Sequence, residues 1–350
     1  MLKGAVSPCK LVLANASMIL LTRQHLAAAM LFILTLVGCK GGDSPSDSLE
    51  VAVRGLHTAA LTNDGKYAVI GSINHGGSYW QLDSKERLYN WNHSDQEATT
   101  LIASDLADDA PFGLTAGPHK MVLWNTDTGK YHRYWSAPAA ILDLALSADA
   151  RVALLGLDDG SAVLFDIQRG GIVRRLEHGN RVRSVALSQD RKLALTGSED
   201  SRARLWDLST GKEIMTIQHD DDVQHVNLSD DGQLAFSVSK YDKAVLWHSR
   251  SGHIHGELPI KAQGLKLGIR YTTSAFNHDA SLLLTGRTDQ TVELWDVETL
   301  KKRQSWKLPK RHRWKPTGAA ILALSFSEDA NTVVAIASNG FIHHLPVRQE

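Results

Sequence analysis

From residue 49 onward, short apolar segments alternate with polar turns at a regular spacing. Residues 182–188 read Val-Arg-Ser-Val-Ala-Leu-Ser, where apolar and polar side chains alternate with the period of two that is typical of a strand. Apolar segments such as 193–196 follow turns that contain Asp, whose side chain bonds to nearby backbone groups. The pattern therefore predicts strands rather than helices.

The strands belong to a repeat with seven copies. Each copy has an apolar residue, most often Trp, at the end of a strand: Trp80, Trp124, Phe165, Trp206, Trp247, Trp295 and Leu345. An Asp lies sixteen residues before each of them: Asp64, Asp108, Asp149, Asp190, Asp231, Asp279 and Asp329. The steps between copies are 44, 41, 41, 41, 48 and 50 residues, close to the length of a four-stranded propeller blade.

In six copies, another apolar residue lies eleven residues after this Trp or Phe. This position is occupied by Trp91, Trp135, Leu176, Ile217, Leu258 and Trp306. We expect these side chains to form a buried stripe on the outermost strand of each blade.

These residues resemble the WD40-repeat β-propellers over residues 49–350. The fourth copy matches the family's Asp–His–Ser/Thr–Trp network with His178, Thr196, Asp200 and Trp206. The fifth and sixth copies match it in part, with His219, Ser237, Trp247, Thr285, Asp289 and Trp295. The first, second and seventh copies match by register and apolar spacing alone. The resemblance implies a structural role for these side chains, which satisfy one another inside a blade.

The two ends of the repeat region predict how the ring closes. The seventh copy stops five residues after Leu345, too soon for an outermost strand. Residues 49–54 alternate like a strand but have no blade of their own. We expect them to supply the missing strand, because this removes an exposed sheet edge. The predicted fold is an all-β, seven-bladed WD40-type β-propeller closed by an N-terminal strand.

The first 38 residues resemble a signal peptide. Residues 26–38 carry no charge, follow Arg23, and are too short for a bilayer span of about 20 residues. The segment 36–39, Leu-Val-Gly-Cys, resembles the lipobox of bacterial lipoproteins, which implies cleavage after residue 38 and acylation of Cys39, for example with palmitate. Met18 is an alternative start. The alternative interpretation is a short membrane-embedded helix with an incidental Cys.

The segment after the predicted cleavage site links the anchor to the propeller. Residues 39–48 are polar and rich in Gly and Ser, which predicts a flexible tether behind the lipidated Cys39. Position 40 is Lys rather than Asp. By resemblance to Gram-negative lipoproteins, this residue implies the outer membrane, on its periplasmic face.

Composition narrows the classes of function. The chain has 38 Lys and Arg against 38 Asp and Glu, so we expect no nucleic-acid partner. Residues 1–38 hold three basic residues and no acidic one, so cleavage leaves 35 basic against 38 acidic residues, a net charge of −3. Two Cys exclude a disulfide-stapled scaffold.

We predict no catalytic residue, cofactor or metal. The sequence contains no G-x-S-x-G, G-x-x-x-x-G-K or G-x-G-x-x-G string. His253 and His255 share one face of an outer strand, but a metal would need a third ligand that is not in register.

Two insertions, at 259–271 and 307–316, carry the candidate partner-binding residues. Both lie between an outermost strand and the innermost strand of the next blade. They are basic and aromatic, as interaction hot spots often are. The candidates are Lys266, Arg270, Tyr271, Lys310, Arg311, Arg313, Trp314 and Lys315. The alternative is a charged loop that serves only solubility.

We therefore expect a non-catalytic, membrane-anchored scaffold that binds protein partners in the bacterial envelope, or an anionic lipid or glycan surface. A rival hypothesis is an enzyme or small-ligand receptor that uses the central channel of the propeller. A gathering of titratable groups with shifted pKa at the channel would favour it. A cytosolic scaffold would require that the first forty residues are not a signal.

Overall fold

The computed structural model describes residues 42–94, 99–241, 243–259, 269–312, 314 and 318–348. The predicted signal peptide at 1–38 and Cys39 lie outside this part of the chain. Within it, no helix is long and apolar enough to cross a membrane.

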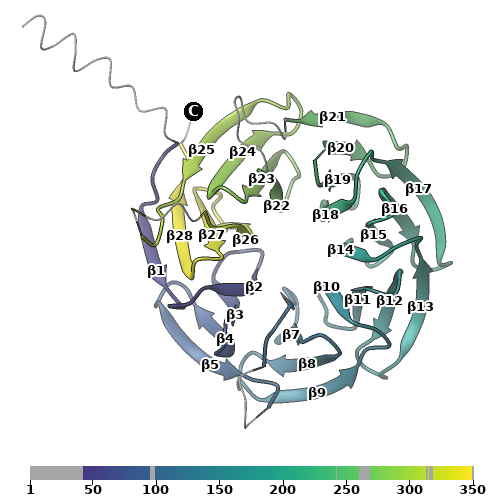
Figure 1. Ribbon diagram of the computed structural model, residues 1–350, viewed down its shortest axis with the longest axis horizontal. Helices are drawn as coiled ribbons and strands as arrows, with labels where there is room; N and C mark the ends of the chain where they lie inside the picture. The colour runs from purple at the N-terminus through teal and green to yellow at the C-terminus, as the bar shows by residue number, and fades with distance from the viewer. Residues whose placement is uncertain are drawn as a thin grey trace, which may run out of the picture. The chain divides into compact units, whose positions relative to one another are not determined.

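Seven four-stranded antiparallel sheets form a ring around a central channel (Figure 1). The first three blades comprise β2–β5 (Leu56–Leu61, Tyr67–Ser72, Gly76–Gln81, Glu86–Trp91), β6–β9 (Ala103–Leu106, Phe112–Ala116, Lys120–Asn125, Tyr131–Ser136) and β10–β13 (Ile141–Leu146, Val152–Leu157, Ser161–Asp166, Ile172–Glu177). Blades four and five comprise β14–β17 (Val182–Leu187, Leu193–Ser198, Arg202–Asp207, Lys212–Gln218) and β18–β21 (Val223–Leu228, Leu234–Ser239, Ala244–His248, Ile254–Leu258). Blade six comprises β22–β25 (Tyr271–Phe276, Leu282–Arg287, Thr291–Asp296, Lys302–Lys307).

The seventh blade closes the ring as predicted. Its sheet has the order β1-β28-β27-β26, so the N-terminal strand β1 (Asp47–Glu50) is the outermost strand beside β28 (Phe341–Pro346), β27 (Thr332–Ala337) and β26 (Ile321–Phe326). The pairing is antiparallel, with Asp47 opposite His344 and Glu50 opposite Phe341. The strand is shorter than the expected 49–54, because the chain leaves the sheet where the N–H groups of Val51 and Ala52 donate to the Gly340 carbonyl.

The expected tether is wrong in its second half. Asp43 forms a parallel bridge with Trp306 of β25, and its N–H donates to the Ser305 carbonyl at 2.8 Å. The Ser46 N–H donates to the His344 carbonyl at 2.9 Å. Residues 43–46 are therefore held on the outer strands of blades six and seven. Their polar composition is that of a linker, but their backbone groups find partners at the open strand edges.

The repeated Asp has a clear local cause. In six of the seven copies its carboxylate accepts a hydrogen bond from the side chain two residues before it, as in Ser188 Oγ to Asp190 at 2.7 Å. It also accepts the backbone N–H two residues after it, as from Lys192 at 3.0 Å. These bonds fix the turn between the first two strands of a blade. Asp108 differs, because it accepts from Asn63 of the preceding blade.

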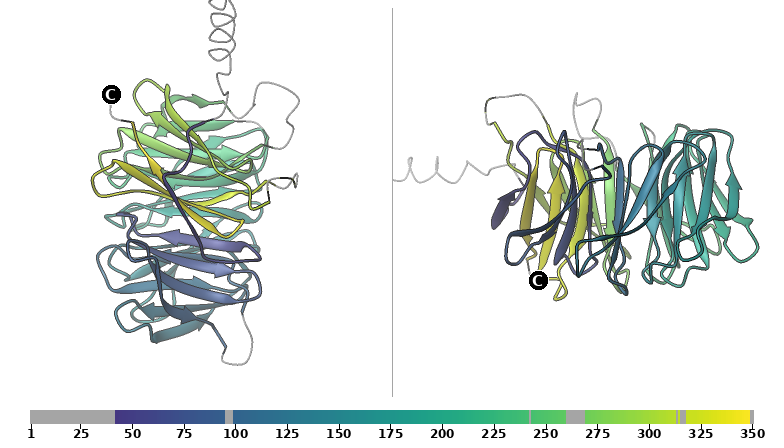
Figure 2. Two further views of the ribbon diagram at one scale, coloured as in Figure 1. Left: turned by 90° about the vertical axis from the view of Figure 1, so that its left-hand side faces the viewer. Right: turned by 90° about the horizontal axis from the view of Figure 1, so that it is seen from below.

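The core lies between neighbouring blades. The expected stripe on the outermost strands is buried at Trp91, Trp306, Leu176, Ile217 and Leu258, and Trp135 is half-buried. Seen edge-on, the strands run between the two faces of the ring (Figure 2). We call the face with the two long connections, β21–β22 and β25–β26, the insertion face. The turns between the second and third strands of each blade lie on this same face.

Candidate interaction surface and central channel

The network in blade four holds its polar side chains in one connected set. His178 Nε2 lies 2.8 Å from Thr196 Oγ1, which accepts the Trp206 indole N–H at 2.8 Å. Arg204 contacts His178 Nδ1 and donates to Asp200 at 2.7 Å. Burial by itself raises the pKa of Asp200, but hydrogen bonds from His178, the Gly179 N–H and Arg204 hold that pKa far below its usual range. Burial lowers the pKa of His178. A neutral imidazole therefore links the buried hydroxyl to the ion pair.

Blades five and six contain parts of this network. His219 Nε2 lies 2.9 Å from Ser237 Oγ, and the Trp247 indole N–H donates to the same hydroxyl. In blade six the Trp295 indole N–H donates to Thr285 at 2.9 Å. Asp289 forms ion pairs with Arg287 and Lys307. The carboxylate is thus used in blade six without a histidine.

Blade two contains a triad that the sequence interpretation missed. His93 Nε2 lies 2.8 Å from Thr115 Oγ1, and the Trp124 indole N–H donates to Thr115 at 2.8 Å. The histidine is 31 residues before the Trp here, against 28 in blade four, and the Thr is nine residues before it instead of ten. A longer connection between blades and a shorter turn moved both residues out of the expected register. A search that allowed these offsets could have found them.

Two of the candidate partner-binding residues are structural. Tyr271 is 3% exposed, and its hydroxyl donates to the Pro259 carbonyl at 2.9 Å, which corrects its assignment to a binding surface. The Arg311 guanidinium donates to Glu50 of β1 at 2.7 Å and to the carbonyls of Ala52 and Asn339. It therefore fastens the closing strand. Sequence alone could not show that these groups already have internal partners.

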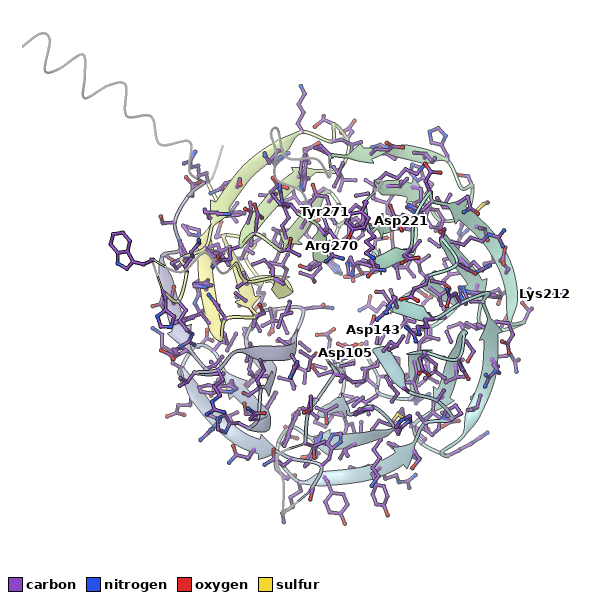
Figure 3. The ribbon with its side chains drawn as sticks, in the orientation of Figure 1. Asp105, Asp143, Lys212, Asp221, Arg270 and Tyr271 are labelled. Atoms are coloured by element: carbon purple, nitrogen blue, oxygen red, sulfur yellow. The ribbon has the colours of Figure 1, made fainter. Side chains whose placement is uncertain are left out.

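The other candidates differ in what the structure shows. Trp314 is 94% exposed on the β25–β26 connection, and Lys310 of the same connection is also exposed. Arg270 is half-buried at the edge of the central opening, with its guanidinium 5.9 Å from the ring centre of Tyr241 (Figure 3). Lys266, Arg313 and Lys315 lie outside the described residues.

The central channel contains a cavity of about 450 Å³ whose lining includes Asp105 of β6 and Asp143 of β10. Both side chains lie beside the central opening (Figure 3). Burial raises the pKa of Asp105 to about 7 and that of Asp143 to about 6. Titratable groups with shifted pKa thus gather in the channel, as the rival hypothesis requires.

The same carboxyls have a structural use. Asp105 accepts the N–H of Leu146 in the next blade at 2.7 Å, and Asp143 accepts the N–H of Val185 at 2.9 Å. Each also accepts the N–H of the residue that follows it. They therefore clamp neighbouring innermost strands together. Within the described part of the chain, no three His, Cys, Asp or Glu side chains are grouped to hold a metal ion.

Comparison with known proteins agrees with this geometry. Residues 170–207 and 269–296 match the family model described as "WD domain, G-beta repeat". The chain is a seven-bladed β-propeller in which two segments match the WD40 repeat. The first stretch covers β13 of blade three and β14–β16 of blade four, and the second covers β22–β24 of blade six. Each stretch includes a Thr–Trp pair of the network.

A curated protein is similar to part of this chain. An 81-residue stretch is 32% identical to WD repeat-containing protein 91 of Danio rerio, and it covers 22% of this chain and 10% of that protein. The chain thus matches about a tenth of the length of this relative. WD40 propellers typically serve as protein-interaction platforms and are generally non-catalytic.

Proposed function

We propose that this propeller is a non-catalytic interaction scaffold, tethered to a bacterial envelope membrane by lipid on Cys39. The lipobox-like segment 36–39 supports the anchor. With Asp43 held on blade six, three residues separate Cys39 from Asp43, and these four steps along the chain reach about 14 Å at most. The propeller would therefore work close to the periplasmic face of its membrane, which we propose is the outer membrane.

The observation that carries the scaffold role is the exposure of Trp314. The Trp314 indole is 94% exposed, so its apolar surface is removed from water only when a partner covers it. Such burial is favourable. Arg311, three residues earlier, fixes the base of this connection to the closing strand and to Asn339. Trp and Arg are the residue types that most often dominate protein interfaces. We propose that Trp314 and the exposed Lys310 contact an envelope protein or an anionic lipid or glycan surface.

Chemical crosslinking in intact cells, followed by mass spectrometry, tests the surface. Trp314→Ala should remove partners that wild type captures, because it deletes the exposed indole without touching an internal contact. Ile172→Ala is the matched control, since Ile172 is also exposed but lies on the outer strand of blade three. Identical partners for wild type and Trp314→Ala would contradict the proposed surface. Arg311 is not a suitable target, because its loss would disturb ring closure.

Labelled palmitate tests the anchor separately. Incorporation should be abolished by Cys39→Ala and retained by Cys9→Ala, since Cys9 would leave with the signal peptide. Label that survives in Cys39→Ala would contradict the lipid site. The scaffold proposal would then rest on the crosslinking result alone.

The channel cavity favours one second candidate, a receptor for a small cationic ligand. Asp105 and Asp143 line the cavity, which makes it acidic when they are ionised. Spermidine is a suitable probe, with thermal unfolding as the measurement. Saturable stabilisation that Asp143→Asn abolishes would support this candidate. The backbone bonds of both carboxyls favour the scaffold instead.

A further inference from the structure

A groove of about 610 Å³ opens between blades one and two, away from Trp314 and from the central channel. Asn90 and Asn92 line it from blade one, and Lys120, Tyr131 and Tyr134 line it from blade two. All five side chains are exposed. His93 also reaches the groove, next to Val122 and Trp124.

A β-bulge places both tyrosines on one face of the outer strand β9. Trp124 pairs with Tyr131 and Val122 pairs with Tyr134, although the tyrosines are three residues apart. Because Trp124 and Val122 are two apart, their partners share a face. Tyr131 and Tyr134 are 67% and 70% exposed. Side chains stand roughly perpendicular to a sheet, so the two rings form adjacent ridges rather than a flat platform.

This aromatic pair is particular to blade two. The same bulge occurs in the other five blades of this type. The paired positions there hold Arg87 and Asn90, Ile172 and Arg175, Glu213 and Thr216, Ile254 and Glu257, or Lys302 and Ser305. The tyrosines are therefore not a requirement of the bulge.

His93 adds a second, independent feature. Its Nδ1 atom is buried and has no hydrogen-bond partner. In blade four the equivalent nitrogen contacts Arg204, which bonds to Asp200. Blade two has Val122 in place of Arg204, and its turn at 117–120 reads Gly-Pro-His-Lys, without a carboxylate. A buried nitrogen with no partner is costly, and an acceptor from a ligand would satisfy it once the atoms that cover it move aside.

The proton on that nitrogen follows from its neighbours. Thr115 Oγ1 accepts the Trp124 N–H, so its own proton is free to donate to His93 Nε2. Burial and the nearby Lys120 lower the pKa of His93 to about 4, so the ring is neutral at pH 7. We assign its single proton to Nδ1. The exposed N–H donors of the groove thus come from Asn90, Asn92 and Lys120, and none of its described lining residues carries a carboxylate. The amide oxygens of the two asparagines and the tyrosine hydroxyls can also accept hydrogen bonds.

We propose that this groove binds a proline-rich segment of a partner protein in the polyproline II conformation. Such a segment has three residues per turn and no internal hydrogen bonds, so its carbonyls remain available as acceptors. Proline has no N–H, so the ligand offers acceptors without donors. Its rings fit between standing aromatic side chains, the way other aromatic-lined grooves bind proline-rich peptides. This inference concerns a surface separate from Trp314 and does not depend on the lipid anchor.

Fluorescence anisotropy of the full chain with fluorescein-labelled decaproline tests the proposal. Wild type should bind saturably, and Tyr131→Ala combined with Tyr134→Ala should weaken binding by about tenfold or more, because both ridges are lost. Ile172→Ala combined with Arg175→Ala, at the same bulge positions of blade three, should leave binding unchanged within about twofold.

Further outcomes decide the ligand class. A Gly-Ser peptide of the same length should not bind, because it is flexible and pays more ordering entropy. Equal binding of that peptide, equal binding by the tyrosine variant, or no saturable decaproline binding would overturn the proposal. Binding of chitotetraose in place of decaproline would also overturn it, in favour of a glycan. Because both tyrosines are exposed, an unchanged unfolding temperature will show that the variant is folded.

Discussion

Blades four and two build the same His–Thr–Trp triad from different spacings, and they differ at the second nitrogen of the histidine. In blade four, Arg204 and Asp200 occupy that side, and both side chains are nearly buried. In blade two, Val122 replaces the arginine, and the shorter turn has no carboxylate. His93 Nδ1 is left without a partner beside an open groove.

The difference separates two roles within one repeat. The triad is common to both blades, so it is the part that a blade uses to fix its indole and hydroxyl. The ion pair is an addition that blade four requires once a charged Arg204 is buried. Blade two lacks this ion pair, and one polar atom of its triad, His93 Nδ1, is left without a hydrogen-bond partner inside the protein.

The largest expected effect comes from breaking the ion pair. Asp200→Ala should lower the free energy of unfolding by about 3 kcal/mol, because it removes the closer of the two carboxylates that pair with the buried Arg204 charge and leaves only Glu213 at 3.2 Å. Urea unfolding measures this loss. Asp200→Ala combined with Arg204→Val makes blade four resemble blade two, and it should recover most of the stability. A double variant as unstable as Asp200→Ala would contradict the proposed difference between blades two and four.

The shared triad should matter equally in both blades. Thr196→Val and Thr115→Val each leave an indole N–H and a histidine nitrogen without a partner. We expect each to cost roughly 2–4 kcal/mol. Costs that differ by more than about 1 kcal/mol, measured by urea unfolding, would show that the two triads are not equivalent.

The histidines should differ in their dependence on pH. Burial lowers the pKa of His93 to about 4 from an ordinary value of 6.5, so the folded protein binds fewer protons than the unfolded chain between these values. Its contribution to stability is therefore present above pH 6.5 and lost as the pH falls toward 4. The cost of His93→Gln should shrink by about 3 kcal/mol over that range.

The same measurement on His178→Gln is the control. Asp200 beside His178 partly offsets the effect of burial on its pKa, so the change with pH should be smaller. Equal changes in the two variants would mean that the ion pair does not influence its histidine.

The smallest expected effect is at the groove. Tyr134→Ala in blade two and Thr216→Ala in blade four occupy the same bulge position. Tyr134 is 70% exposed, so its loss should change the free energy of unfolding by no more than about 0.5 kcal/mol. Thr216→Ala should change the free energy of unfolding by a similarly small amount. A large loss at Tyr134 would indicate that the ring supports the blade instead of facing a ligand.

Sequence sufficed for the fold because its signals are local and repeated. The Asp turns, the apolar stripes and the spare N-terminal strand predicted seven blades and their closure, and all are present. The blade-two triad was missed because two small length changes moved His93 and Thr115 out of register. Residues placed out of register by such length changes are not found when the repeat is assigned at fixed offsets.

The candidate surface was harder to predict, for a different physical reason. Tyr271 and Arg311 have the composition of an interaction hot spot, but Tyr271 bonds to the Pro259 carbonyl across the β21–β22 connection, and Arg311 bonds to Glu50, 261 residues earlier in the chain. Whether a donor is free depends on those distant acceptors. The groove residues were not predicted as a surface at all. The bulge that aligns Tyr131 with Tyr134 follows from strand pairing, which sequence spacing does not reveal.

Imidazole ¹H–¹⁵N NMR of the histidine-labelled full chain tests the central comparison most directly, with His93→Gln used to assign the signal. At pH 7 we expect His93 to be neutral and protonated on Nδ1, and we expect this N–H signal to shift on addition of decaproline, whereas that of His178 should not. A charged His93, a proton on Nε2, or a His93 signal that decaproline leaves unchanged would contradict it.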